Sequence, residues 1–263
     1  MAGRGGCFLG ASLSCTDLLV YLYARFLRFP EGSLTHADRD VLLLSKGHDV
    51  PALYGTLVEF GHLAAERLER HCEVDDSIYW HPSRDVPGVE FHSGSLGHLL
   101  AIGVGMALDA KLRRAASRIV VILGDGELDE GSVWESLLVA SAHRLRNLVL
   151  IVDRNGFQAN ARTEELIPLE PLAQKFRAFG VSVREVDGHR FDELDESLGY
   201  FDPDCDRPRV VIARTVRGKG LPSIEARADR WFCRLGPEDV ESLLRELHGG
   251  AEADRDLETL VVR

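Results

Sequence analysis

Oxygen-bearing side chains follow two apolar segments of strand length that lie about 30 residues apart. Residues 119–123 run into a glycine, Asp125 and a second glycine, and residues 148–152 run into a polar turn that contains Asn155. Carboxylate and amide oxygens are the ligands that Mg²⁺ prefers, and bound magnesium commonly binds phosphate oxygens as well. The two segments therefore predict an anchor for a divalent metal ion and a diphosphate.

Neither polar residue is specific when taken alone. An aspartate at a strand end often only caps the next helix, and Asn155-Gly156 is more often a tight turn than a ligand. The pairing matters because ligands of open α/β sheets bind outside the carboxyl ends of neighbouring strands. Gly124 and Gly126 also precede a predicted helix, where free backbone N–H groups favour an anion.

The elements that must hold these residues alternate between strand and helix patterns. Apolar, largely β-branched runs predict strands at 41–45, 119–123, 148–152, 181–186 and 210–216. Helical patterns occupy 18–27 (after a Thr16-Asp17 cap), 52–58, 97–112, 131–145, 168–179, 190–198 and 237–247, and residues 72–92 are polar and predict a loop. Continuous apolar strands are typical of parallel sheets that are covered on both sides. The predicted fold class is α/β, a parallel sheet with helices on both faces.

Composition limits the possible functions of the chain. With 263 residues and 45% apolar content, we expect one large domain over residues 1–248 and a charged tail at 249–263. The net charge of −11 argues against nucleic-acid binding, which requires a basic face. There is no secretory signal and no apolar run of membrane-spanning length, so we expect a cytoplasmic protein without a membrane partner. The five cysteines are scattered and suggest neither a zinc site nor a disulfide framework.

Several segments, in order along the chain, resemble transketolases. The run from Gly124 to Glu127 with Glu130, and the later Asp153-Arg154-Asn155, are similar to the thiamine-diphosphate motif of that family. Other similar segments are Ser45-Lys46-Gly47-His48, Trp80-His81-Pro82-Ser83, Phe91-His92-Ser93-Gly94-Ser95-Leu96-Gly97 and Thr215-Val216-Arg217-Gly218-Lys219-Gly220. Ordered agreement over roughly residues 7–235 is more specific than any one motif.

The resemblance implies a thiamine-diphosphate-binding fold that holds the cofactor with Mg²⁺, which Ca²⁺ or Mn²⁺ can replace. The implied metal ligands are Asp125, Asn155 and the backbone oxygen of Phe157. The implied cofactor-binding residues are His48, Gly94, Ser95, Leu96, Gly124, Asp125, Gly126, Glu127, Asn155 and Phe157. The implied catalytic residues are His48, His81 and Glu130; His81 faces the hydroxyl groups of the donor, and Glu130 meets its counterpart across a dimer interface.

A complete transketolase continues into a second domain, which supplies the glutamate that activates the pyrimidine ring. This chain ends before that domain, so the resemblance implies the N-terminal subunit of a split, two-component transketolase. Such a protein is active only with a separate C-terminal subunit, and we expect an α2β2 assembly. The implied reaction moves a two-carbon ketol unit from a ketose, or a ketose phosphate, to an aldehyde acceptor.

Two positions lack a histidine that is usual in the family. Phe8 stands where a histidine is common, and Phe232 lies where a tryptophan-histidine-glycine step is usual. We therefore expect a less polar acceptor side, suited to an apolar aldehyde or to a sugar of specialised metabolism. Two alternatives remain open: a decarboxylating relative, such as a deoxyxylulose-phosphate synthase or a 2-oxoacid dehydrogenase E1-like subunit, and a non-catalytic scaffold subunit.

Overall fold

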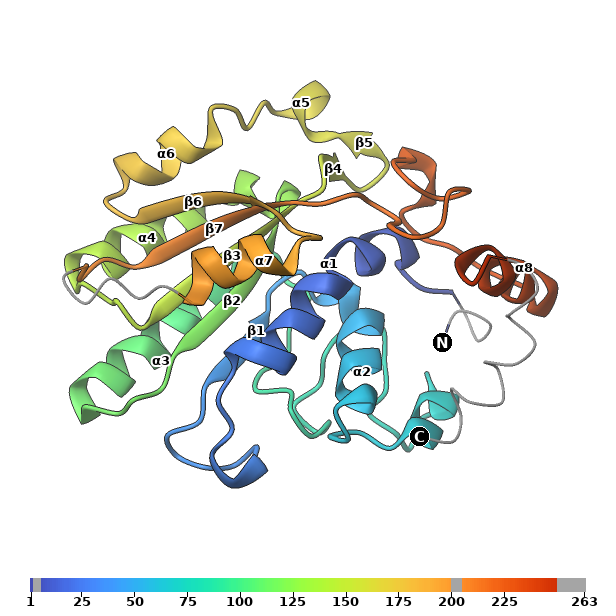
Figure 1. The fold of residues 1–263 in the computed structure, drawn as a ribbon, viewed down its shortest axis with the longest axis horizontal. Helices are drawn as coiled ribbons and strands as arrows, with labels where there is room; N and C mark the ends of the chain where they lie inside the picture. Colours follow the sequence, from blue (N-terminus) through green and yellow to red (C-terminus); the bar gives the residue numbers. More distant parts are fainter. Residues whose placement is uncertain (2–5, 200–204, 250–263) are drawn as a thin grey trace.

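A five-stranded parallel sheet forms the centre of the protein (Figure 1). The computed structural model describes residues 1, 6–199 and 205–249. The strand order is β1-β2-β3-β7-β6, and every neighbouring pair is parallel. The sheet strands are β1 (Val41–Leu44), β2 (Ile119–Gly124), β3 (Leu148–Arg154), β6 (Ser182–Asp187) and β7 (Arg209–Arg214).

Helices cover both faces of this sheet (Figure 1). The main helices are α1 (Leu9–Tyr21), α2 (Val50–Glu59), α3 (Leu99–Arg113), α4 (Gly131–Ala142), α6 (Leu172–Ala178) and α8 (Pro237–Leu247), and short helices are α5 (Thr163–Leu166) and α7 (Phe191–Leu194). Alternate residues of each strand point to opposite faces. One apolar cluster accordingly joins Val120 and Ile122 to α1, α2 and α7, and the other joins Val121 and Leu123 to α3, α4 and α6. The predicted fold class is confirmed.

Most predicted elements are present, but the first helix begins earlier than expected. It starts at Leu9 instead of after a Thr16-Asp17 cap. The Thr16 hydroxyl donates to the backbone oxygen of Ser12 one turn back, as a residue inside a helix does, so it caps nothing. The helix continues through a π-helical turn at Leu22–Phe26. The predicted loop at 72–92 is confirmed, because no helix or strand lies there.

The sequence patterns gave no sign of one small hairpin. Strands β4 (Phe157–Gln158) and β5 (Ala161–Arg162) form an antiparallel pair directly after β3. The proposed domain boundary at residue 248 and the charged tail at 249–263 stay predictions, since residues 250–263 lie outside the described part. Within the described residues, no helix combines the length and apolar character needed to cross a membrane.

The parallel register brings the carboxyl ends of the strands to one edge. Gly124 is the register partner of Asp153, and Arg154 is the partner of Arg214. The loops that follow β1, β2, β3 and β7 therefore leave the sheet side by side. This edge is where open α/β sheets bind their ligands.

Candidate active site

A cavity of about 450 Å³ opens at this edge of the sheet. Every predicted site residue except Ser95 and Glu130 lines it. The lining residues are Phe8, Ala11, Lys46, His48, His81, Gly94, Leu96, Gly124, Asp125, Gly126, Glu127, Asn155, Phe157, Gln158, Ala159, Arg217 and Trp231. Residues that are far apart in the sequence thus share one concave site.

The carboxylate of Asp125 lies at the end of β2 and is only 1% exposed. Its Oδ1 accepts a hydrogen bond from the backbone N–H of Gly126 at 3.0 Å, and its Oδ2 accepts from Gly156 N at 2.6 Å and from Arg154 Nη1 at 3.1 Å. Burial and the nearby Asp153 nevertheless raise the pKa of Asp125 to about 6. A buried carboxylate with this environment favours a bound cation beside it.

The turn after β3 carries the other two implied metal ligands, which are Asn155 Oδ1 and the backbone oxygen of Phe157. Asn155 Oδ1 accepts a hydrogen bond from the backbone N–H of Phe157 at 3.0 Å, which closes an Asx turn. The adjacent N–H of Gly156 donates to Asp125, so this turn is held against the end of β2. A carboxylate, a carboxamide oxygen and a backbone carbonyl form a donor set that fits Mg²⁺.

Two glycines keep space in the cavity that side chains would fill. A Cβ at Gly126 would lie 2.7 Å from Gln158 Cγ, and a Cβ at Gly94 would lie 2.4 Å from His81 Cδ2. Gly94 also has a φ of +125°, which side-chain-bearing residues rarely adopt. The backbone can therefore approach a ligand closely at both positions, as diphosphate and ring binding require.

The carboxylate of Glu127 joins three segments beneath the cavity. Its Oε1 accepts hydrogen bonds from Gly97 N at 2.7 Å and from the Ser45 hydroxyl, and its Oε2 accepts from Gly124 N at 3.2 Å. Burial raises the pKa of Glu127, while these hydrogen bonds oppose the rise. These contacts tie the loops after β1 and β2 to the turn before α3.

Aromatic rings surround the two candidate catalytic histidines. The Phe8 ring lies 5.3 Å from the His48 ring and 6.4 Å from the His81 ring, measured between centroids. It also packs against Trp231 at 4.9 Å and Phe232 at 5.0 Å. Burial lowers the pKa of both imidazoles. They are therefore neutral near pH 7, a state in which each can donate and accept a hydrogen bond.

Comparison with known proteins identifies the family. A family model described as "Transketolase, thiamine diphosphate binding domain" matches residues 3–256. The chain belongs to the transketolase family. Our predictions of a thiamine-diphosphate-binding, transketolase N-terminal chain and of its fold are thereby confirmed.

Named relatives include both split and complete transketolases. The chain is 36% identical over 240 residues to a subunit of the apulose-4-phosphate transketolase of Phocaeicola vulgatus, covering 91% of this chain and 85% of that one. It is 33% identical to a 6-deoxy-6-sulfo-D-fructose transketolase subunit of Clostridium sp., covering 91% and 87%. The crystal structure of Campylobacter jejuni transketolase superposes with a TM-score of 0.85 at 26% identity, over 98% of this chain and 44% of that one. The chain therefore spans less than half of this solved transketolase.

Two predicted site residues of this transketolase chain lie outside the cavity lining. Ser95 is exposed, and its hydroxyl lies 3.1 Å from His98 Nδ1. Glu130 is exposed where α4 begins, and its Cβ would lie 2.7 Å from a Cβ placed on Gly97. An exposed Glu130 agrees with a role at a subunit interface, but that role stays a prediction.

Two basic residues, Lys46 and Arg217, line the cavity although the sequence did not predict them as site residues. Lys46 and Arg217 belong to segments that carry the family resemblance, yet both are almost fully buried here, at 1% and 2% exposed. Arg217 Nη1 donates to the backbone oxygen of Ala159 at 2.6 Å, and its guanidinium lies 5.2 Å from the centre of the Phe157 ring. Burial lowers the pKa of Arg217, and Asp49 opposes this. In the sequence, the only sign that Lys46 and Arg217 lie at the cavity is that each follows the end of a predicted strand.

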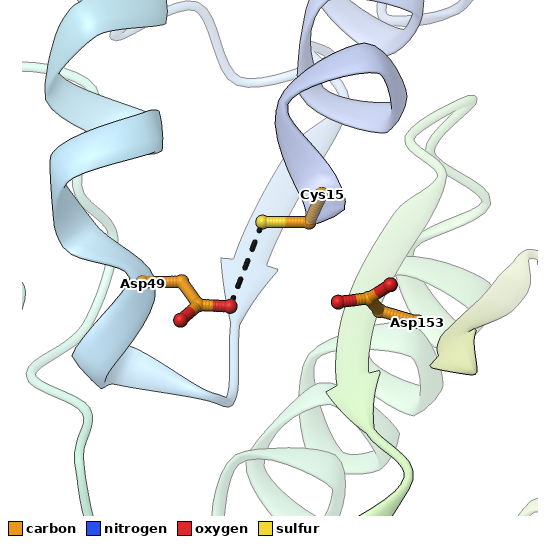
Figure 2. Close-up of side chains that lie close together, drawn as sticks. All are labelled: Cys15, Asp49 and Asp153. Atoms are coloured by element: carbon orange, nitrogen blue, oxygen red, sulfur yellow. Dashed lines mark hydrogen bonds between the residues drawn. The ribbon is translucent and has the colours of Figure 1, made fainter. Parts of the chain in front are cut away.

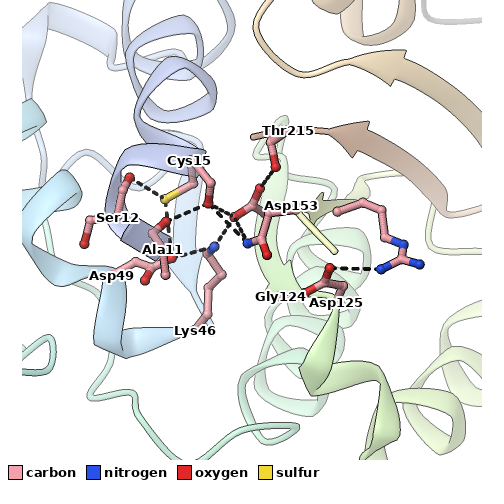
Figure 3. Close-up of polar contacts among 12 residues, drawn as sticks. Ala11, Ser12, Cys15, Lys46, Asp49, Gly124, Asp125, Asp153 and Thr215 are labelled. Carbon is pink, nitrogen blue, oxygen red and sulfur yellow. Dashed lines mark hydrogen bonds and ion pairs between the residues drawn. The ribbon is translucent and has the colours of Figure 1, made fainter. Parts of the chain in front are cut away.

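A buried polar cluster lies directly beneath the cavity. Donor atoms of Cys15, Asp49 and Asp153 lie within 4.8 Å of one another (Figure 2), a spacing that suits a metal ion. However, Lys46 Nζ pairs with Asp49 Oδ2 at 2.5 Å and also with Asp153 (Figure 3). The ammonium group takes the place of a metal cation there, so we assign no metal to this cluster. Burial raises the pKa of the Cys15 thiol well above its ordinary value, which makes that thiol unreactive.

Proposed function

We propose that the chain is the cofactor-binding subunit of a two-component transketolase that moves a two-carbon ketol unit from a ketose, or a ketose phosphate, to an aldehyde. The observation that carries this proposal is that Asp125, Asn155 and Phe157, which supply the oxygen donors, line the same cavity as His48 and His81. Relatives named as transketolase subunits, of which the chain covers 85–87%, support a split enzyme.

The donor set supports a specific way of holding the cofactor. When bound, thiamine diphosphate supplies the carbon nucleophile and the electron sink for cleaving the bond beside a ketose carbonyl. Asp125, Asn155 and the Phe157 carbonyl would hold Mg²⁺, which Ca²⁺ or Mn²⁺ can replace. The remaining cofactor contacts that we propose come from His48, Gly94, Ser95, Leu96, Gly124, Gly126 and Glu127.

The histidines would act on the substrate. Neutral imidazoles at His48 and His81 can orient hydroxyl groups of the donor and move a proton to or from its oxygen atoms. The apolar Phe8 ring lies beside both imidazoles and offers them no hydrogen-bond partner. Glu130 would act indirectly, through contact with another protein chain.

The companion protein would complete the cleft, and we propose an α2β2 assembly in the cytoplasm. The test is reconstitution: the purified chain, its C-terminal transketolase companion and the mixture are each assayed for ketol transfer with thiamine diphosphate and Mg²⁺. Activity is expected only in the mixture, together with a mass that fits two copies of each protein. Ketol transfer by the chain alone would contradict the proposal, and consumption of pyruvate would instead indicate a decarboxylating enzyme.

The aromatic wall supports an acceptor that is less polar than an ordinary pentose phosphate. Phe8 and Trp231 line the cavity, and Phe232 packs behind them. Aromatic faces favour apolar or C–H-rich surfaces over hydroxyl groups that need hydrogen-bond partners. A panel of aldehydes tested on the reconstituted enzyme measures this preference. A higher kcat/KM for ribose 5-phosphate than for every less polar aldehyde would overturn it.

A further inference from the structure

The carboxamide of Asn155 is held in one orientation by groups beneath the cavity. Its Nδ2 donates to Asp153 Oδ2 at 3.2 Å and to the Ser14 hydroxyl at 3.3 Å. A carboxylate only accepts hydrogen bonds, so Asp153 must face the NH₂ group and not the oxygen of the amide. Oδ1 is thereby kept on the side of Phe157, whose N–H it accepts.

Asp153 is itself fully enclosed by donors. It is 0% exposed, and its Oδ2 accepts from Ser14 Oγ at 2.5 Å and from Lys46 Nζ. Its Oδ1 accepts from the hydroxyl of Thr215, after β7 (Figure 3). Helix α1 and the ends of three strands therefore meet at one carboxylate, which fixes its position.

Lys46 balances two buried acids at once. Asp49 is also 0% exposed and pairs with the same ammonium group at 2.5 Å. Leaving either acid buried without a cation would strongly destabilise the fold, because the charge would have lost both water and its partner. The ion pair with Lys46 therefore stabilises the buried carboxylate of Asp153 next to Asn155.

We propose that Asp153 is a positioning residue that turns the Asn155 carboxamide oxygen toward the metal side of the cavity, and that Lys46 is the buried cation that makes this arrangement possible. The inference rests on the proposed role of Asn155 in holding Mg²⁺ with thiamine diphosphate. It adds two supporting residues to the proposed metal ligands: Asp153, which is not among the lining residues of the cavity, and Lys46, whose ammonium group is paired with two buried acids. Such supporting residues commonly change metal affinity by about 10- to 100-fold when they are replaced.

The test must separate orientation of the amide from stability of the fold. Removing Lys46 alone leaves two unpaired acids, so Lys46→Met and Asp49→Asn are combined with an uncharged residue at position 153, which leaves the whole cluster without charge. In this background, Asp153→Asn keeps an acceptor oxygen for Asn155 Nδ2, whereas Asp153→Leu, of similar size, removes it. The two triple variants carry the same charge and form a matched pair.

Each variant is assembled with its companion protein and titrated calorimetrically with thiamine diphosphate at saturating Mg²⁺, and then with Mg²⁺ at fixed cofactor. Thermal unfolding without ligands serves as the structural control. We expect similar unfolding temperatures for the pair, but Mg²⁺ and cofactor affinities about 10-fold or more weaker for the leucine variant. Equal affinities in the two variants would overturn the inference.

Two further outcomes are informative. If the triple variants do not fold, single Asp153→Asn and Asp153→Leu variants give the same comparison, because Lys46 keeps Asp49 as its partner. A wild-type complex that does not bind thiamine diphosphate would contradict the proposed function itself. Wild-type binding with no difference between the asparagine and leucine variants would contradict only the positioning role.

Discussion

The backbone N–H of Gly156 donates a 2.6 Å hydrogen bond to Oδ2 of Asp125. This bond joins the loop after β3 to the end of β2 and so holds together the two strand ends that carry the candidate metal ligands. The other oxygen of Asp125 accepts from Gly126 N at 3.0 Å. The carboxylate is thus oriented by backbone groups before any ligand arrives.

Replacing Asp125 with asparagine should make the stability of the cofactor-free chain less dependent on pH. The pKa of Asp125 in the folded chain is raised to about 6, above its ordinary value of 3.8. Because the pKa is higher in the folded than in the unfolded chain, the free energy of unfolding decreases as the pH rises from about 4 to about 6. Above about pH 6 the decrease is complete. The wild type should therefore lose about 1 to 2 kcal/mol of stability between pH 5 and pH 7.5 that Asp125→Asn does not lose, while the variant loses Mg²⁺-dependent cofactor binding.

Urea unfolding of both proteins at pH 5 and at pH 7.5 checks this expectation. The free energy of unfolding of the variant, relative to that of the wild type, should be higher at pH 7.5 than at pH 5. The reason is that the wild-type carboxylate is ionised at pH 7.5. The same pH dependence of stability in both proteins would contradict a raised pKa for Asp125.

Replacing Gly94 with alanine should disturb the wall that holds His81. The new Cβ would lie 2.4 Å from His81 Cδ2, at a backbone φ of +125°. We expect a loss of about 1 to 3 kcal/mol in unfolding free energy and weaker cofactor binding by the complex. Gly105→Ala in α3 is the matched control, because a Cβ there meets nothing within 4 Å. Equal behaviour of the two variants in unfolding and calorimetry would refute this account of Gly94.

Replacing Phe8 with histidine should shift the acceptor preference of the reconstituted enzyme. The variant places a hydrogen-bonding ring beside His48 and His81, which lie 5.3 and 6.4 Å from the present Phe8 ring. We expect kcat/KM to rise about 10-fold for polyhydroxylated acceptors relative to apolar ones, the size of one added hydrogen bond. Phe60→His is the control, because Phe60 is not among the residues that line the cavity. No change in the ratio of the two kcat/KM values would count against a substrate-facing Phe8.

Activity of the complex should fall on the acidic side of neutrality. Burial lowers the pKa values of His48 and His81 from their ordinary value of 6.5, so both remain neutral until the pH drops below it. Protonation then removes their acceptor nitrogens. We expect kcat/KM to be level from pH 7 to 8 and to decline below about 6.5. Retention of the same acidic limb in a His48→Gln, His81→Gln double variant would assign the decline to other groups.

The sheet and the metal-side residues could be predicted because local patterns determine them. Runs such as 148–152 are apolar throughout, as strands buried on both faces are, and parallel strands place their following residues at one edge. Asp125 and Asn155 follow two neighbouring parallel strands, β2 and β3, and therefore line the same cavity. The hydrogen bonds that orient them depend on Gly156 and Asp153, whose roles no local pattern indicates.

Other features depend on contacts between distant segments. The first turns of α1 contain Gly10, Ser12 and Ser14, which are modest helix formers, and they are helical because the helix packs into the interior. A Cβ at Gly10 would lie 3.0 Å from the backbone of Arg230 and 3.3 Å from Arg217 Cγ. Similarly, a lysine is normally exposed, and only the folded chain reveals that Lys46 is enclosed between two acids.

The Phe8 ring contacts four other rings, from the loops after β1 and before α3 and from the segment that precedes α8. Substitutions at Trp231, Phe232 or either imidazole will consequently not have independent effects, because each changes the packing that the others experience through Phe8. Divergence of substrate range in this lineage should therefore show strong epistasis centred on position 8, with the same replacement at Trp231 helpful beside one residue there and harmful beside another.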